Sequence, residues 1–234
     1  MPMEITIKYL HVKTMNNIEK YRFLVFGLIV VLLIFIPIVN AQEVESNHQT
    51  RTSIELGYKL SDQLKLNLSP EFRFDENLAL DKYLFEGAAI YKPSKIFALG
   101  ATYRFVVNLR DEKDTEYFNR VALSATMKKE FNRFEPAFRL RYSNYADDAI
   151  TDKEFIRYKG SFKYDIDNCK ITPSAGIEVF QQLSDFELYK TRYSVGTDYK
   201  LFKKNYLGVS YKFDSFAIED KNTRILSLTY KLKL

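Results

Sequence analysis

Strict alternation of apolar and polar residues is the dominant feature of the chain from Thr52 onward. In the segment 205–214, four apolar residues lie on one face and four small or polar residues on the other: Leu207, Val209, Tyr211 and Phe213 against Gly208, Ser210, Lys212 and Asp214. A period of two sends successive side chains to opposite faces of a β-strand. No segment in this region has the period of an amphipathic helix. The pattern therefore predicts an all-β chain whose strands are apolar on one face only.

The alternating segments predict about eleven strands separated by short polar turns. They span residues 52–60, 63–74, 80–92, 95–108, 115–129, 132–145, 154–166, 169–182, 186–201, 205–214 and 223–233. Bacterial single-chain membrane barrels have even strand numbers. We therefore expect about ten to twelve strands and favour twelve, with residues 43–50 adding a short first strand. Residues 42–51 are accordingly interpreted as a short linker or partial strand, and residues 52–234 as the barrel domain.

The connections between these strands alternate in length. Tight turns are expected near residues 61–62, 93–94, 131–132, 167–168 and 203–204. Longer connections are expected at residues 75–79, 109–114, 146–153, 183–185 and 215–222. Short turns at one end and longer loops at the other are typical of transmembrane barrels, whose short turns face the periplasm. This regularity predicts an antiparallel up-and-down transmembrane β-barrel.

A soluble barrel or sandwich would show the same alternation with its apolar face turned inward. Three features favour the membrane, and the first is strand length, which matches a tilted span of the hydrocarbon layer. Second, the polar face carries small residues near strand middles: Gly57, Ala88, Gly100, Ser124, Ala137, Ser143, Gly160, Gly176, Gly196 and Gly208. Third, the apolar face carries aromatic residues toward strand ends, as interfacial girdles do: Tyr58, Phe72, Phe74, Tyr83, Tyr91, Phe105, Tyr142, Tyr158, Tyr164 and Tyr199. We also expect Tyr189 on the apolar face of its strand.

The first 41 residues have the organisation of a secretory signal. Residues 23–39 are an apolar run that follows Lys20 and Arg22 and ends in Val39-Asn40-Ala41. A basic start, an apolar centre and a small-residue exit predict cleavage before residue 42. An uncleaved membrane anchor is the alternative, because the run approaches the length of a span. Translation from either Met1 or Met15 would produce this signal.

Charge and composition exclude several classes of function. The formal net charge is +5, and the chain after the predicted signal holds 31 basic and 28 acidic residues. Such a balance argues against a nucleic-acid-binding protein, which needs a concentrated basic face. The single cysteine, Cys169, excludes an internal disulfide and a multi-cysteine zinc site. We expect neither a metal nor a cofactor.

Histidine-dependent chemistry is also disfavoured. One of the two histidines, His11, lies in the predicted leader, and the other, His48, precedes the first predicted strand. A Ser/His or Asp/His site inside the barrel is therefore not available. The chain is predicted not to be an enzyme. The alternative that stays open is a lipid-modifying enzyme that uses luminal carboxylates, for example Glu71 with Asp198.

Charged residues on the polar face point to the interior as the place where a function would reside. The candidate luminal network comprises Glu71, Arg73, Glu86, Arg104, Arg120, Arg139, Arg141, Arg157, Glu178, Arg192 and Asp198. Its surplus of basic groups would favour small anions in a narrow channel or binding cavity. Alternatively, Glu71, Glu86, Glu178 and Asp198 would bridge arginines and fill a narrow barrel.

Four short segments resemble a known family: residues 64–74 (LKLNLSPEFRF), 80–83 (LDKY), 100–105 (GATYRF) and 139–142 (RLRY). The mature chain resembles the uncharacterised outer-membrane β-barrel family called domain of unknown function 2490, common in Bacteroidota. The resemblance implies an outer-membrane barrel and supplies no reaction, ligand or catalytic residue. An outer-membrane barrel is expected to contact outer-membrane lipid and the barrel-insertion machinery, and the basic lumen adds small anions to the expected partners. A secreted soluble β-barrel that binds a ligand is the remaining alternative.

Overall fold

The computed structural model describes residues 45–109, 114–146, 153–217 and 221–234. The predicted signal peptide, its cleavage site and both candidate start residues lie outside the described residues. None of the described segments forms a helix with the length and hydropathy of a membrane span.

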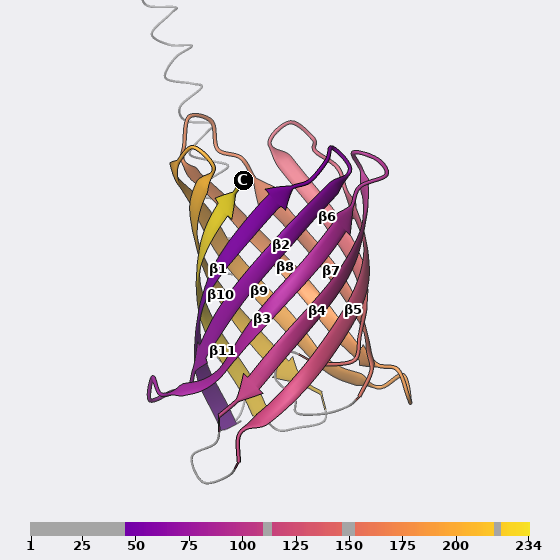
Figure 1. The fold of residues 1–234 in the computed structure, drawn as a ribbon, viewed down its shortest axis with the longest axis vertical. Coiled ribbons are helices and arrows are strands. Elements are labelled where there is room, and N and C mark those ends of the chain that lie inside the picture. The colour runs from indigo at the N-terminus through magenta and orange to yellow at the C-terminus, as the bar shows by residue number, and fades with distance from the viewer. Residues whose placement is uncertain (1–44, 110–113, 147–152, 218–220) are drawn as a thin grey trace, which may run out of the picture. The chain divides into compact units, whose positions relative to one another are not determined.

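The described chain folds into eleven strands that form one closed barrel (Figure 1). The strands are β1 Glu45–Lys59, β2 Leu64–Phe74, β3 Leu80–Tyr91, β4 Phe97–Asn108, β5 Glu116–Lys128, β6 Phe134–Ser143, β7 Phe155–Tyr164, β8 Ile171–Gln182, β9 Leu188–Phe202, β10 Asn205–Phe216 and β11 Lys221–Lys233. Each strand pairs antiparallel with the next one along the chain. The predicted all-β, up-and-down barrel is confirmed.

The preferred count of twelve strands is wrong. Residues 45–51, expected as a linker or a separate short strand, are the first part of β1, which runs without a break to Lys59. An odd number of alternating strands brings the first and last together pointing the same way. Accordingly, β1 and β11 pair in parallel from Glu45↔Lys221 to Gly57↔Lys233, and Figure 1 shows the two arrows pointing alike.

The connections define two rims of the barrel. At the short-turn rim, the strands are joined by residues 60–63, 92–96, 129–133, 165–170 and 203–204. At the long-loop rim lie the strand ends that flank the connections 75–79, 109–115, 144–154, 183–187 and 217–220. The two longest connections, 109–115 and 144–154, belong to the long-loop rim, as the sequence predicts. The expected long connection near 215–222 is only 217–220, and the expected tight turn near 167–168 extends over 165–170, because β10 and β11 run further than the alternation indicates and β7 and β8 stop short. Asn132 and Asn168 close two of the short turns with φ of 53° and 54°. Asparagine tolerates this left-handed conformation better than most residues, so these turns suit their sequence.

The strands are strongly tilted, and register shows the tilt directly. The row of paired residues that starts at Asn47, near the long-loop rim, passes through Thr223, Asp214 and Arg192. It continues through five further strands to Ala98, at the opposite rim. Closing a sheet into a barrel requires such a stagger. An inward row of this kind therefore crosses the barrel from one rim to the other.

The apolar faces of the strands point outward and are exposed. Leu123 and Phe138 in strand interiors are 60% and 50% exposed, and most of the aromatic residues predicted for the apolar face are also exposed there. The charged faces point inward, where their side chains meet across strands. The soluble arrangement, with the apolar face inside, is not what the structure has. Gly160, predicted on the polar face, instead pairs with outward Phe138 and Ile177 and lies outside.

Tyr189 is a second departure from simple alternation. The β8–β9 register shifts so that Phe180 pairs with Lys190 while Gln181 pairs with Leu188, which leaves Tyr189 as an extra residue on β9. A β-bulge of this kind turns a side chain to the other face. Tyr189 therefore packs inside the barrel against Phe155, at 5.1 Å between ring centroids, and not on the outer face as predicted.

Candidate functional site: the luminal charge network

The half of the lumen nearer the long-loop rim is filled with side chains. Each strand contributes at least one buried inward residue there, in order from β1 to β11: Arg51, Arg73, Leu84, Asn108, Arg120, Ser143, Arg157, Glu178, Arg192, Asp214 and Ile225. Several of these have almost no surface in contact with water, among them Arg73, Asp214 and Ile225. Water therefore does not reach the wall of the barrel at this level.

Aromatic rings and cations pack together in this filled half. Phe155, Phe180, Tyr189 and Phe216 form one buried cluster with Ala146. The ammonium of Lys190 lies 4.7 Å from the centroid of Phe180 and 5.0 Å from that of Phe216, and the Arg157 guanidinium lies 4.3 Å from that of Phe180. Cations over ring faces are attracted by the ring quadrupole, more strongly where water is excluded. The cluster therefore buries two cations without losing all of their electrostatic stabilisation.

Asp214 on β10 accepts hydrogen bonds from two cations of β9. The Arg192 guanidinium donates from Nε to Oδ1 at 2.5 Å and from Nη2 to Oδ2 at 2.6 Å. Lys190 donates from Nζ to Oδ2 at 2.8 Å. Register places Arg192 directly opposite Asp214. This two-pronged geometry is the strongest form of an arginine–carboxylate pair, and it ties two neighbouring strands together inside the barrel.

Glu178 on β8 has a similar role between β6 and β7. Its Oε1 accepts from Arg139 Nη2 at 2.9 Å and from Arg157 Nε at 3.0 Å. Because Glu178 also lies opposite Arg192 in register, it belongs to the tilted inward row of Asp214. We call this set the charged row: Asp214, Arg192, Glu178, Lys159 and Arg139.

A second ionic group lies on the opposite wall. Glu71 Oε1 accepts from Arg73 Nε at 2.6 Å, and Arg51 Nη1 is 4.0 Å from the same oxygen. Glu86 pairs with Arg104 across β3 and β4 at 2.6 Å. Glu71 and Glu178 thus each contact two arginines, as predicted, whereas Glu86 pairs with Arg104.

Tyr145, which follows β6, connects two arginines of the lumen. Arg141 Nη2 donates to the Tyr145 hydroxyl at 2.7 Å, and the Arg104 guanidinium lies 4.8 Å from the centroid of the same ring. Arg120 is buried nearby, where its Nη1 donates to the carbonyl oxygen of Asn144 at 3.2 Å. The loop that begins after β6 is thus held by arginines of three different strands.

Asp198 does not join these groups. It pairs with Lys231 at 2.6 Å, and not with an arginine as predicted, in the half nearer the short-turn rim. Glu71 lies on β2 and Asp198 on β9, with β10, β11 and β1 between them. Each of the two carboxylates has its own cation. The structure therefore does not bring Glu71 and Asp198 together as a catalytic pair.

Hydrogen-bond donors without partners lie where the filled half ends, toward the middle of the barrel. Within the described residues, Arg139 Nε and Arg141 Nε are buried without a hydrogen-bond partner. In the charged row, Lys159 lies between Arg139 and Glu178. Its ammonium has no carboxylate within ion-pair distance in the described part of the chain. Four cations from β6 and β7 thus share this wall with Glu178: Arg139, Arg141, Arg157 and Lys159. Buried donors of this kind require water or a ligand that accepts hydrogen bonds.

Small residues line one part of the lumen nearer the short-turn rim, along β6 to β9. One step beyond the charged row, Ala137, Ser161, Gly176 and Ser194 follow one another in register, and none is fully buried. A Cβ at Gly176 would come within 3.0 Å of Ser161 Cβ, so close contact between strands restricts this position to glycine. Beside these small side chains, Arg139 and Lys159 are half-buried, whereas Glu178 and Arg192 are buried.

Sequence reasoning missed several members of the network. Asp214 and Lys190 lie on the polar face that the alternation predicts, but only the register shows that they meet. Arg51 was missed because β1 was expected to begin at residue 52. Tyr145 and Tyr189 gave no sequence signal, since one follows the last residues of β6 and the other depends on a bulge.

No group of three or more metal-ligating side chains occurs in the described ranges. Cys169 is an exposed free thiol in the turn before β8.

Comparison with known proteins gives the family and nothing more specific. No curated protein matches the chain. A family model described as "Protein of unknown function (DUF2490)" matches residues 48–223, which extend from the start of β1 into β11. The chain therefore belongs to the DUF2490 family.

Proposed function

We propose that this chain is an outer-membrane β-barrel that binds small anions in its lumen, at the wall formed by Arg139, Arg141 and Lys159. The membrane part of the proposal rests on the exposed apolar exterior, since soluble proteins rarely expose contiguous apolar surface of this extent. Strand length supports it as well, because the strands have 10 to 15 residues and a tilted membrane strand needs about 9–11.

The unsatisfied donors are the observation that carries the anion-binding part. Arg139 and Arg141 present buried Nε groups, Lys159 presents an ammonium, and Glu178 is the one carboxylate paired within this wall. Small anions accept hydrogen bonds and carry the charge that this wall lacks. The small residues toward the short-turn rim give such an anion a path to the site.

We further propose that the barrel is not an open pore. The filled half contributes buried side chains from all eleven strands, so ions that reach the anion wall from the short-turn side meet a closed end. In the outer membrane the short-turn rim would face the periplasm, as the short turns of membrane barrels do.

Chloride binding to the detergent-solubilised barrel tests the anion site. Broadening of the chloride-35 NMR line is expected with the native protein, and the double variant Arg139→Gln/Lys159→Gln should lose most of it. The matched control is Lys92→Gln/Lys95→Gln, which removes the same charge from exposed turn positions and should retain the broadening. Equal broadening in both variants, or none in the native protein, would overturn the anion site.

Two further measurements address the remaining parts of the proposal. The native protein should fractionate with the outer membrane and migrate on gels with heat-modifiable mobility. In planar bilayers it should show no steady conductance. A stable open-channel current would contradict the closed lumen, and recovery in the soluble periplasmic fraction would contradict the membrane location.

A further inference from the structure

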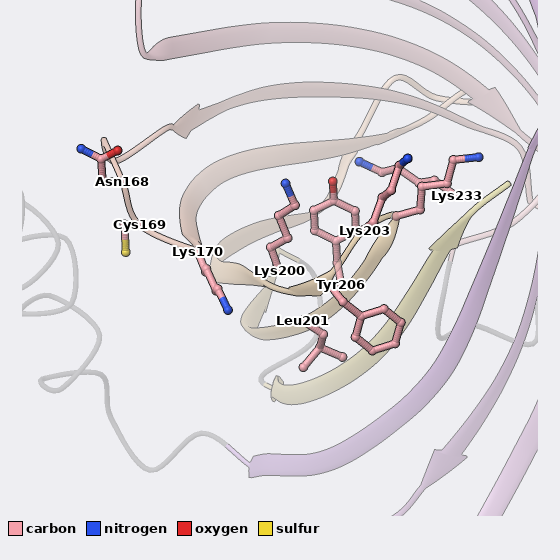
Figure 2. A pocket seen from close by; sticks show the side chains of 10 residues that line it. Asn168, Cys169, Lys170, Lys200, Leu201, Lys203, Tyr206 and Lys233 are labelled. Carbon is pink, nitrogen blue, oxygen red and sulfur yellow. The ribbon is translucent and has the colours of Figure 1, made fainter.

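A pocket of about 750 Å³ lies at the short-turn rim, away from the anion wall (Figure 2). It is formed where the turn before β8, the end of β9, the start of β10 and the end of β11 meet. Five lysines and one tyrosine are the polar side chains that matter for its chemistry: Lys170, Lys200, Lys203, Lys204, Lys233 and Tyr206. We call this site the lysine pocket.

The backbone holds these lysines close together. The Lys200 amide donates to the carbonyl of Lys170 at 2.8 Å, and the Lys233 amide donates to the carbonyl of Lys204 at 2.9 Å. Four of the five lysines are thus placed by main-chain hydrogen bonds, which do not depend on the conformations of their side chains. A substitution of the side chains would leave this framework intact.

The lysine pocket lacks negative charge. None of its five lysines has an Asp or Glu oxygen within ion-pair distance in the described ranges of the chain. The nearest carboxylate along β9, Asp198, is occupied by Lys231. The ammonium of Lys233 instead contacts a ring, with Nζ 4.1 Å from the centroid of Tyr206. Like charges gathered without counter-ions raise the local concentration of anions.

The pocket has a polar side and an apolar side. In Figure 2 the ammonium of Lys200, the hydroxyl of Tyr206 and the ammonium of Lys233 point to one side, whereas Leu201 and the ammonium of Lys170 point to the other. Phe202, which follows Leu201, also lines the pocket and is largely exposed. A ligand that fits both sides has an anionic head and an apolar body.

The hydrogen-bonding chemistry of the lysine ammonium groups limits which ligand head groups fit the pocket. Ammonium groups only donate hydrogen bonds, and several of them together suit a group with many acceptor oxygens and more than one possible contact, as a phosphate has. A pocket of about 750 Å³ has room for more than one phosphate. It would hold a head group with its glycerol, while the acyl chains follow the outer apolar face of the barrel.

We propose that the lysine pocket binds the phosphate of an anionic phospholipid at the rim of the barrel. The proposal rests on the proposed function in one respect, because it places the short-turn rim at a membrane surface. Basic groups near such a surface are attracted to anionic lipid. The lysine pocket is separate from the anion wall, so either site can fail alone.

Binding of short-chain lipids to the full chain in a non-ionic detergent tests the proposal. Dihexanoyl phosphatidylglycerol should bind at least tenfold more tightly than dihexanoyl phosphatidylcholine, as measured by titration calorimetry. The triple variant Lys200→Gln/Lys204→Gln/Lys233→Gln should lose at least tenfold in affinity for phosphatidylglycerol. The matched control, Lys92→Gln/Lys95→Gln/Lys129→Gln, removes three exposed lysines of the same rim and should bind as the native protein does.

Inorganic phosphate and glycerol 3-phosphate distinguish a lipid from a soluble phosphate. If either binds as tightly as phosphatidylglycerol with the same dependence on the three lysines, the lipid assignment is overturned in favour of a soluble phosphate compound. An equal loss in both triple variants would show attraction to the basic rim as a whole and would overturn the site, as would a lack of binding. Heat-modifiable mobility of every variant verifies folding. A protein that is a membrane barrel but binds no phosphatidylglycerol refutes this inference alone.

Discussion

The Asp214 carboxylate has no exposed surface and holds both Lys190 and Arg192. Such a buried group adds little net stability when it is paired, because desolvation offsets the attraction. Its removal is costly, since two cations then remain in a site that water does not reach. The importance of Asp214 for folding is therefore larger than the strength of its hydrogen bonds suggests.

Asp214→Asn should lower the free energy of unfolding by about 3–5 kcal/mol, the range for breaking a buried ion pair by removing one partner. Asp198→Asn is the matched control. Its pair with Lys231 is partly exposed, at 23% and 26% of the two side chains, and its loss should cost less than about 1 kcal/mol. Urea unfolding in detergent micelles measures both values. Equal effects of the two substitutions would contradict the closed environment of Asp214.

At this scale the sequence predicts which residues are luminal better than it predicts their partners. Alternation places Glu178 and Arg157 on the polar face, and the structure confirms that they meet. It cannot predict that Asp198 pairs with Lys231, because that pairing depends on the registers of the β9–β10 and β10–β11 hairpins together. A shift of one residue in either register would turn one of the two side chains to the other face, and the alternation alone does not contain the register.

Among the elements, β1 and β11 depart furthest from expectation. The rule of even strand number favours a twelfth strand, and the structure instead extends β1 back to Glu45 and closes the barrel through a parallel pair. On the inner face of this seam, the hydroxyls of Ser53 and Thr229 are 2.9 Å apart. Strand positions elsewhere agree with the alternation to within a few residues, because one apolar face fixes the limits of each strand.

A cross-link tests the parallel seam directly. In a background of Cys169→Ser, Ser53→Cys/Thr229→Cys pairs two residues that are opposite each other in register and should form a disulfide under mild oxidation. Non-reducing gels would show the faster mobility of the cross-linked band. Ser53→Cys/Thr223→Cys, in which the second cysteine lies six residues away on the same strand face, is the control and should stay reduced. Cross-linking of the control alone would refute this register.

For the whole molecule, the outward apolar surface is the property with the clearest energetic consequence. Leu123 lies near the middle of β5 and faces outward, whereas Tyr117 faces outward near the end of the same strand. In a bilayer the first position would lie in hydrocarbon and the second near the interface. In water the two would be equivalent surface positions.

Leu123→Arg should therefore lower the unfolding free energy in lipid vesicles by about 2–4 kcal/mol, and Tyr117→Arg by about 0–1 kcal/mol. Reversible unfolding of the barrel from vesicles measures the difference. A soluble barrel would tolerate both changes within about 0.5 kcal/mol, as exposed substitutions usually are. Near-zero effects at both positions would thus contradict the membrane location.

The odd number of strands determines on which side of the membrane each end of the barrel domain would lie. Because β1 and β11 run in parallel, β1 begins at the long-loop rim and β11 ends at the short-turn rim. In the proposed orientation, the start of the barrel sequence opens to the cell surface and its end opens to the periplasm. An antibody against an epitope placed before Glu45 should label intact cells, and one against an epitope after Leu234 should require permeabilised cells. In that orientation the eleven strands would cross the membrane an odd number of times, so the two ends of the barrel domain would lie in different compartments.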